Sequence, residues 1–182
     1  MTNTKNNIFA IEYLELMTEC QKELQKFRKQ KSFILFGKDI VLTDEKASEI
    51  IQCSIEEYED TIVLKYSKED LYASFVFSTY EDCLHAESYL DDTYNPEKFF
   101  LSYYEHELED LTNDQIKEIF NSFNQDQLKY FSAMYYTAVE AKIIEDYKSK
   151  YISLKSKYPD VPFYPVFDFN YDLTDYYESS TC

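Results

Sequence analysis

The residues best suited to chemistry stand together in one short stretch, Glu105-His-Glu-Leu-Glu-Asp110. Residues four apart lie on one face of a helix, so His106 would face Asp110 and Glu105 would face Glu109. Carboxylates and an imidazole at that spacing can hold a hard divalent cation or form the acid cluster of a metal-dependent nuclease. Such pairs also arise by chance in a strongly acidic segment, so we expect a binding surface here, with no metal and no catalytic residue.

The wider search for catalytic motifs is negative. A single glycine, Gly37, excludes a P-loop and a dinucleotide fingerprint, because both need several glycines close to phosphate. The chain has no GxSxG or HExxH motif and no CxxC pair. Its four cysteines are therefore expected to be reduced thiols, and no cofactor is expected. His85, three residues after Asp82, is expected on a helix surface.

Net charge is the strongest signal in the sequence. The chain has 35 acidic and 18 basic residues, and its net charge is −17. Residues 44–126 hold 22 of the acidic and 5 of the basic residues, whereas residues 1–43 and 127–182 are close to neutral. Solubility needs a net charge of only about 2–8 in a small domain. The excess indicates a surface that binds a basic partner; the alternative is a solvated acidic surface with no partner.

The acids of this middle segment occur in short runs, which are the predicted partner-binding residues. On helices and turns they would lie about 5–6 Å apart, comparable to the spacing of phosphates along a nucleic-acid strand. A groove that collects Lys and Arg for phosphate would accept such a surface, whereas nucleic acid itself would be repelled. The predicted binding residues are Glu56, Glu57, Glu59, Asp60, Glu81, Asp82, Asp91, Asp92, Glu105, Glu107, Glu109 and Asp110. Tyrosines that suit an interface accompany them: Tyr58, Tyr80, Tyr89, Tyr94, Tyr103 and Tyr104.

The first half of the chain predicts one helix and two hairpins. Apolar residues from Phe9 to Phe27 recur every three or four positions, which predicts an amphipathic helix over 6–31. Residues 33–36 and 40–42 flank Gly37 and predict a β-hairpin. A helix capped by Thr43 or Asp44 would follow to Cys53, and residues 61–66 and 71–78 predict a second hairpin.

The second half is predicted to be helical. Capping signals open helices at Thr79, at Asn95-Pro96, at Thr112 or Asn113, and at Asn124. These helices would end near Leu90, Glu109, Phe123 and Lys157. The predicted fold class is therefore α+β, mainly helical with a small antiparallel sheet. Residues 1–158 would form a single domain, and residues 159–182 an extended aromatic and acidic tail packed on the domain or on a partner.

The sequence also predicts a compartment. Glu12 and Glu15 interrupt the apolar residues near the N-terminus, which argues against a signal peptide. No apolar run approaches the roughly 20 residues that span a bilayer. We expect a cytoplasmic protein of a bacterial cell that does not bind membranes.

In size and in the character of residues 44–126, the chain resembles the small acidic proteins that phages direct against host nucleases, in particular anti-CRISPR inhibitors of Cas9. This resemblance implies an inhibitor that binds the basic nucleic-acid groove of a Cas9-type nuclease and blocks engagement of DNA or guide RNA.

Two other functions fit the same sequence. An immunity protein or antitoxin that neutralises a basic nuclease toxin would use the same acidic surface. A metal-dependent nuclease that acts on guide RNA would use the cluster at Glu105–Asp110. The chain is therefore expected to bind a basic protein, and whether it is also an enzyme stays open.

Overall fold

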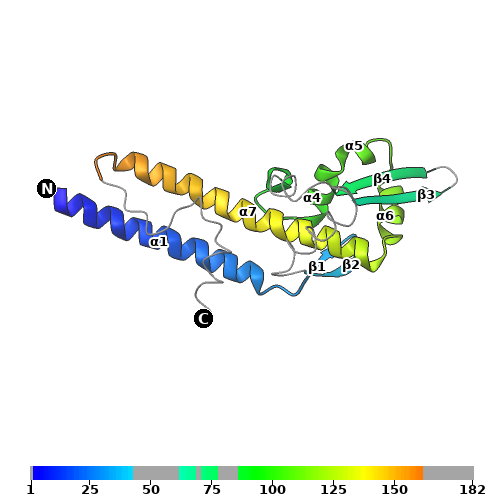
Figure 1. Cartoon of the computed structure of the whole chain (residues 1–182), viewed down its shortest axis with the longest axis horizontal. Coiled ribbons are helices and arrows are strands. Elements are labelled where there is room, and N and C mark those ends of the chain that lie inside the picture. The colour runs from blue at the N-terminus through cyan, green and yellow to red at the C-terminus, as the bar shows by residue number, and fades with distance from the viewer. Residues whose placement is uncertain (1, 43–61, 69–70, 78–85, 162–182) are drawn as a thin grey trace. The chain divides into compact units, whose positions relative to one another are not determined.

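The computed structural model describes residues 2–42, 62–68, 71–77 and 86–161 (Figure 1). The described part is mainly helical and carries antiparallel strands, as the sequence predicts. Its elements are α1 (Thr2–Arg28), β1 (Ser32–Leu35), β2 (Lys38–Val41), β3 (Ile62–Lys68), β4 (Leu71–Phe77), the 3-10 helix η1 (Ala86–Tyr89), α4 (Pro96–Tyr103), α5 (Glu105–Leu108), α6 (Asn113–Asn121) and α7 (Gln125–Lys157). The two hairpins, β1–β2 and β3–β4, form separate two-stranded sheets and not one sheet.

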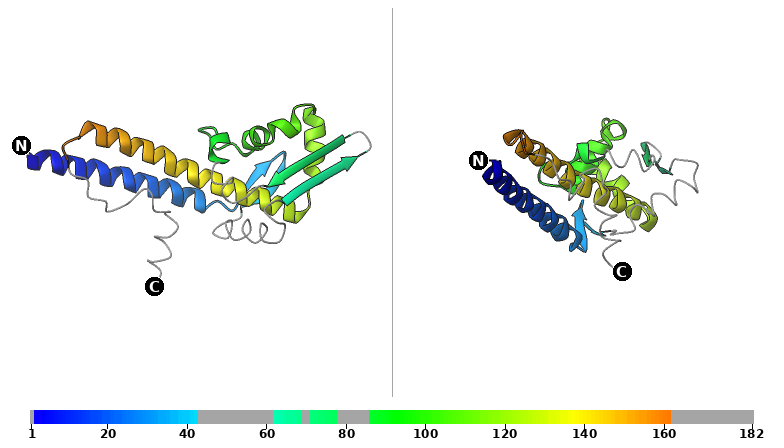
Figure 2. Two further views of the ribbon diagram at one scale, coloured as in Figure 1. Left: turned by 45° about the horizontal axis from the view of Figure 1, so that its top comes forward. Right: turned by 60° about the vertical axis from the view of Figure 1, so that its left-hand side comes forward.

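The described residues form two compact units. The first contains residues up to Gln25 and from Ile143 onward, where α1 and α7 run antiparallel (Figures 1 and 2). Phe9 and Tyr13 of α1 pack edge-on against Tyr158 and Tyr151, with ring centroids 5.8 and 5.7 Å apart. Val161 is also a buried member of this hydrophobic cluster. The apolar face that the sequence predicts for the first helix is therefore the face that α1 buries.

Charged groups at the edge of this unit also join the two helices. Lys157 donates hydrogen bonds to Glu12 at 2.8 and 3.2 Å, and these lower the pKa of the Glu12 carboxyl. Between the helices, Cys20 is fully buried, and burial raises the pKa of its thiol to about 11. A thiol with such a pKa stays protonated and unreactive at neutral pH.

The second unit, residues 26–142, is built around an aromatic core. Six consecutive residues of α7, Phe131–Tyr136, are all buried, so elements pack on every side of the helix there. Periodicity in the sequence does not predict this all-round burial, because it cannot reveal how many neighbours a helix has. The largest fully buried rings of the unit are Phe99, Phe100, Tyr104, Phe120 and Phe131.

The first hairpin is fixed to this core by its turn. Phe36 and Gly37 both have positive φ, 47° and 79°, which is the backbone of a type I′ turn between antiparallel strands. Positive φ is strained for a bulky residue. Packing compensates, because the Phe36 ring lies 5.4 Å from Phe100 and 5.2 Å from Phe120. Behind the hairpin, the Ser132 hydroxyl donates to the Val41 carbonyl at 2.8 Å.

The predicted helix starts at Asn95, Thr112 and Asn124 are confirmed. The Asn95 side chain accepts from the Lys98 amide at 2.9 Å, and Pro96 follows it. Thr112 with Gln115, and Asn124 with Gln127, form reciprocal capping boxes. Each cap satisfies amide groups that the first turn of a helix leaves without partners.

Other predicted boundaries differ. The helix expected to run to Glu109 breaks at Tyr104, which has φ −104° and ψ 26° and is 1% exposed. Insertion of this ring into the core between Phe100 and Tyr103 accompanies the break. Of the helix expected from Thr79 to Leu90, the described part holds only η1. The predicted helix at 44–53, residues 55–60 and the tail from 162 lie outside the described residues.

Replacing Phe100 by Ala should lower the free energy of unfolding by about 3–5 kcal/mol, because it leaves a cavity among five aromatic rings. These rings are Phe36, Tyr104, Phe120, Phe123 and Phe131. Ile34→Ala should cost less than about 0.5 kcal/mol, since a largely exposed side chain loses little burial. Ile34 is 61% exposed. Chemical denaturation followed by far-UV circular dichroism measures both. Equal losses in the two variants would contradict the placement of the core.

Candidate partner-binding surface

The structure describes six of the twelve predicted binding acids. Asp91 and Asp92 lie in the turn between η1 and α4, Glu105 and Glu107 lie on α5, and Glu109 and Asp110 follow it. The other six, Glu56, Glu57, Glu59, Asp60, Glu81 and Asp82, lie outside the described residues.

Asp91 holds the turn that leads into α4. Its Oδ1 accepts from the Thr93 amide at 3.0 Å, the Thr93 hydroxyl at 2.6 Å and the Asn95 amide at 3.3 Å. Its Oδ2 lies 2.8 Å from Lys98 Nζ. These bonds, that of Lys98 first, hold the pKa of the Asp91 carboxyl far below its usual range. Because the Asp91 carboxylate is bonded to other groups of the chain, it contributes less negative charge to a partner-binding surface than Asp92 does.

Asp92, the next residue, has the opposite environment. Its side chain is 98% exposed, and its contact with Lys142 Nζ is long, at 3.7 Å. An exposed pair of this kind contributes about 0–1 kcal/mol. Its carboxylate therefore faces solvent.

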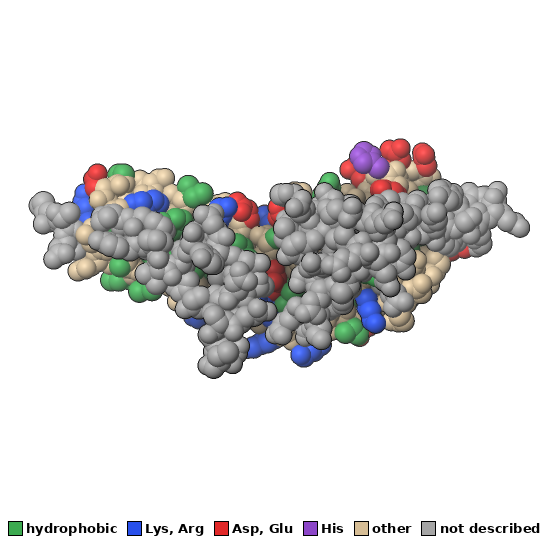
Figure 3. Space-filling view, in the orientation of Figure 1, with side chains coloured by type: hydrophobic (Ala, Val, Ile, Leu, Met, Phe, Trp, Pro, Cys, Tyr) green, Lys and Arg blue, Asp and Glu red, His purple; other side chains and the backbone are tan. Residues whose placement is uncertain are grey.

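The α5 region exposes four acidic side chains to solvent and buries one leucine side chain. Glu105, Glu107, Glu109 and Asp110 are all exposed, whereas Leu108 is buried. Within the described part of the chain, no Lys, Arg or His forms an ion pair with any of the four acids. Figure 3 shows the red side chains beside a histidine over this part of the molecule. Their mutual repulsion is the cost of concentrating negative charge here.

Two further exposed acids, Asp114 and Glu118, lie on the next helix. They stand on α6 opposite its buried residues Ile116, Ile119 and Phe120. The sequence carried a signal for them, because a spacing of four places both on one helix face. We call the exposed acids of α5, α6 and the turn between them the α5–α6 acidic surface: Glu105, Glu107, Glu109, Asp110, Asp114 and Glu118.

The sequence predicted His106 and Asp110 on one helix face, and the structure does not place them so. Because α5 ends at Leu108, His106 and Asp110 do not share a continuous helix. Among the described residues, no three His, Cys, Asp or Glu side chains gather closely enough to hold a metal ion. The exposed arrangement offers charge to a partner and little of the enclosure that a catalytic centre uses.

The tyrosines expected at an interface fall into two groups. Tyr89 is 46% exposed, and its ring lies 5.3 Å from that of Tyr103 in an edge-to-face arrangement. Tyr104 is buried, so the core and not the surface uses its ring. Tyr94 is partly buried, with φ 50°, and its carbonyl accepts the Tyr135 hydroxyl at 2.6 Å. Tyr58 and Tyr80 lie outside the described residues.

The chain matches no protein-family model, no curated protein and no solved structure. None of the helices in the described ranges has the length and apolar character that crossing a membrane requires.

Asp91→Asn should be less stable than the wild type at pH 7, because the amide loses the charge pair with Lys98. The folded pKa of Asp91 is lowered, so its contribution is present above the unfolded pKa of about 3.9 and is lost as pH falls through the folded pKa. The stability difference between variant and wild type should therefore shrink below about pH 4. Chemical denaturation between pH 7 and pH 3 measures it.

Asp92→Asn is the matched control, since it makes the same chemical change one residue away at a side chain that is 98% exposed. It should leave stability nearly unchanged at every pH. A difference for Asp91→Asn that stays constant across the pH range would contradict the role given to its charge.

Proposed function

We propose that this protein is an acidic inhibitor that binds the basic nucleic-acid groove of a host nuclease, a CRISPR–Cas9 effector in the first instance, and blocks engagement of DNA or guide RNA. The observation that carries the proposal is the α5–α6 acidic surface. Between residues 105 and 118 it has six acids and a single lysine, Lys117. All six acids are exposed.

The spacing of this surface supports binding in a groove made for phosphates. Asp114 and Glu118, four residues apart on α6, would have Cβ atoms about 5–6 Å apart, which suits lysine and arginine side chains placed for a nucleic-acid backbone. Complementary charge would speed association and make it sensitive to salt. The same negative field disfavours nucleic acid as the ligand, because phosphates would be repelled.

The rigidity of the surface supports the proposal as well. Tyr104 and Leu108 anchor the α5 region, and Ile119 and Phe120 anchor α6, all with 6% exposure or less. Charges held on packed helices lose less conformational entropy on binding than charges on a loose chain. A preformed acidic surface can therefore compete with nucleic acid for a groove.

Reversing Glu105, Glu107, Glu109 and Asp110 together to Lys should slow association with a purified Cas9–guide RNA complex at least about tenfold in low salt, because steering charges mainly change the association rate. Each reversal alone should do little, since one exposed ion pair contributes about 0–1 kcal/mol. Association rates can be measured by biolayer interferometry at 50 and 500 mM salt, with inhibition of DNA cleavage as a second readout.

The matched control reverses Glu15, Glu19, Glu145 and Asp160, four exposed acids outside the α5–α6 acidic surface, and makes the same change in net charge. Its association should fall much less. Equal losses in both variants would mean that only total charge matters. Wild-type binding that is unaffected by salt and by competing DNA would contradict occupation of the groove.

His106→Ala should leave inhibition of DNA cleavage almost intact, because the exposed imidazole adds little to a surface built from carboxylates. The measurement is a DNA-cleavage titration with wild-type and variant protein, with and without magnesium. Complete loss of inhibition, together with magnesium-dependent degradation of guide RNA by the wild type, would favour the nuclease function instead.

A further inference from the structure

A basic segment interrupts this acidic chain at the point where α1 ends. Residues 26–31 read Lys-Phe-Arg-Lys-Gln-Lys and hold four cations and no acid. The attraction of cations to the C-terminal end of a helix explains charge in its last turn, where Lys26 and Arg28 lie. It does not explain Lys29 and Lys31, which follow the helix, because the effect of the helix dipole falls off within that turn.

The structure pairs one of these four cations with an acid. The Arg28 side chain forms an ion pair with Glu140 of α7, and both side chains are largely shielded from solvent. Lys26, Lys29 and Lys31 are exposed. Within the ranges that the structure describes, none of their ammonium groups forms an ion pair with a carboxylate. We call these three lysines the α1-end basic surface.

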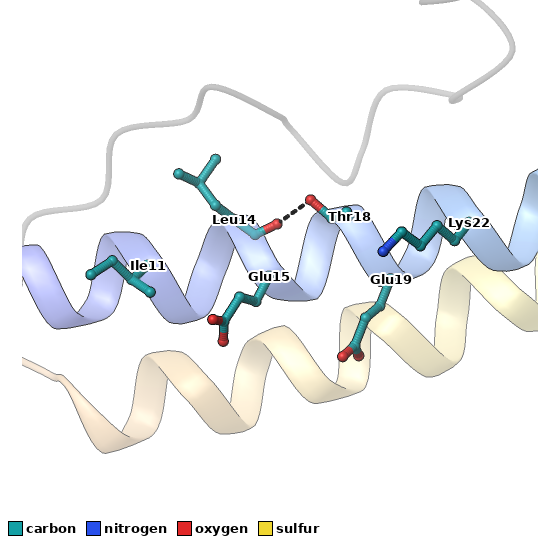
Figure 4. Close-up of a pocket in the computed structure, with 6 residues that line it drawn as sticks. All are labelled: Ile11, Leu14, Glu15, Thr18, Glu19 and Lys22. Carbon is teal, nitrogen blue, oxygen red and sulfur yellow. Dashed lines mark hydrogen bonds between the residues drawn. The ribbon is translucent and has the colours of Figure 1, made fainter.

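Earlier on α1, a lysine lies among acids. Lys22 lines a shallow pocket together with Glu15 and Glu19, and its side chain points back along the helix toward Glu19 (Figure 4). Glu23, the acid that most closely precedes the basic segment, accepts a hydrogen bond from the Tyr147 hydroxyl, so its carboxylate is bonded within the chain. Among the described residues, the α1-end basic surface is therefore the part of this helix where positive charge stands without acids of its own.

The backbone under this surface is fixed by packing and hydrogen bonds. Phe27 is 6% exposed, and its ring centroid lies 5.1 Å from that of Tyr136 on α7. The Gln30 amide donates to the Phe27 carbonyl at 2.9 Å, and the Leu42 amide donates to the Lys31 carbonyl at 2.9 Å. The outer two lysines are five residues apart, so their Cα atoms are separated by at most about 18 Å. All three ammonium groups can therefore contact one extended polyanion.

We propose that the α1-end basic surface contacts phosphates of the guide RNA when this protein is bound to its nuclease partner. The inference rests on the proposed function and adds a second contact to it: the guide RNA stays bound, and DNA is what the inhibitor excludes. Lysine is a common ligand of phosphate, and a nucleic-acid strand presents a phosphate about every 3.4 Å. Three lysines can therefore find phosphates along a strand without a precisely shaped pocket.

Net charge makes this contact depend on the nuclease. A chain of net charge −17 repels free nucleic acid, and it also repels a second copy of itself. The α5–α6 acidic surface and the α1-end basic surface both belong to the second unit. Binding of the acids in a basic groove therefore also brings the lysines to the complex, which raises their effective concentration near its RNA. RNA that the nuclease already holds is favoured over free RNA for this reason.

The test is the triple variant Lys26→Gln/Lys29→Gln/Lys31→Gln, whose affinity for purified Cas9 is measured by biolayer interferometry with and without guide RNA. Loss of three phosphate contacts should weaken binding to the guide-loaded form at least about fivefold. Binding to the guide-free form should not weaken, because a more negative protein suits a basic groove at least as well. Far-UV circular dichroism checks that the exposed substitutions leave the fold intact.

Lys5→Gln/Lys150→Gln/Lys157→Gln is the matched control, because it changes three exposed lysines of the first unit and alters net charge by the same amount. It should leave both affinities close to those of the wild type. Equal losses in variant and control would overturn the inference, since total charge would then explain the effect. Equal losses with and without guide RNA would overturn it as well, and so would an unchanged affinity of the triple variant for the guide-loaded form.

These three results leave the proposed function standing, because the wild type binds in each of them. A wild type that binds neither form of Cas9 would instead overturn the proposed function and this inference with it. A wild-type dimer in sedimentation velocity that the triple variant converts to monomer, with unchanged affinity for guide-loaded Cas9, would overturn the inference in favour of a second copy whose acids meet these lysines.

Discussion

The ring of Phe100 joins elements that are far apart in the sequence. Its centroid lies 5.1–6.4 Å from the rings of Tyr104, Phe131, Phe36, Phe120 and Phe123. Those rings come from the first hairpin, from both ends of the α5–α6 region and from α7. Aromatic pairs at such distances add to the free energy that burial alone provides. The exposed acids lie close to this cluster in sequence, because Tyr104 directly precedes α5 and Phe120 is on the buried side of α6.

This arrangement also explains how the chain tolerates its charge. α5 has four residues, too few to be stable alone in water, and its acids repel one another. Leu108 and the neighbouring Tyr104 are buried, and their burial offsets that repulsion. Burial in the aromatic core therefore stabilises the helices that carry the concentrated exposed charge. This relation explains why the chain is both rich in aromatic residues and strongly acidic.

Sequence patterns predicted the elements whose signals are local. The capping residues Asn95, Thr112 and Asn124 satisfy amides within three positions, and the Gly37 turn joins adjacent strands, so neighbouring residues suffice to define them. The break at Tyr104 and the all-round burial of Phe131–Tyr136 were not predictable in that way. Both depend on which distant rings meet in the core, and helical periodicity carries no information about that. Similarly, the pattern of acidic residues predicted where negative charge is concentrated. It did not show which carboxylates are bonded to other residues of the chain.

Asp91 and Asp92 show why the sequence alone does not reveal which carboxylates are available to a partner. The two residues are chemically identical and adjacent, and both belong to a run of acids in the same negative segment. One carboxylate accepts hydrogen bonds from Thr93 and Asn95 and pairs with Lys98, while the other is 98% exposed. A carboxylate that is bonded within the chain must break those bonds before it can bind a partner. A carboxylate in solvent has to lose only its bound water. A run of acids therefore states how much charge a surface can carry, and the hydrogen bonds around each carboxylate decide how much of it a partner meets.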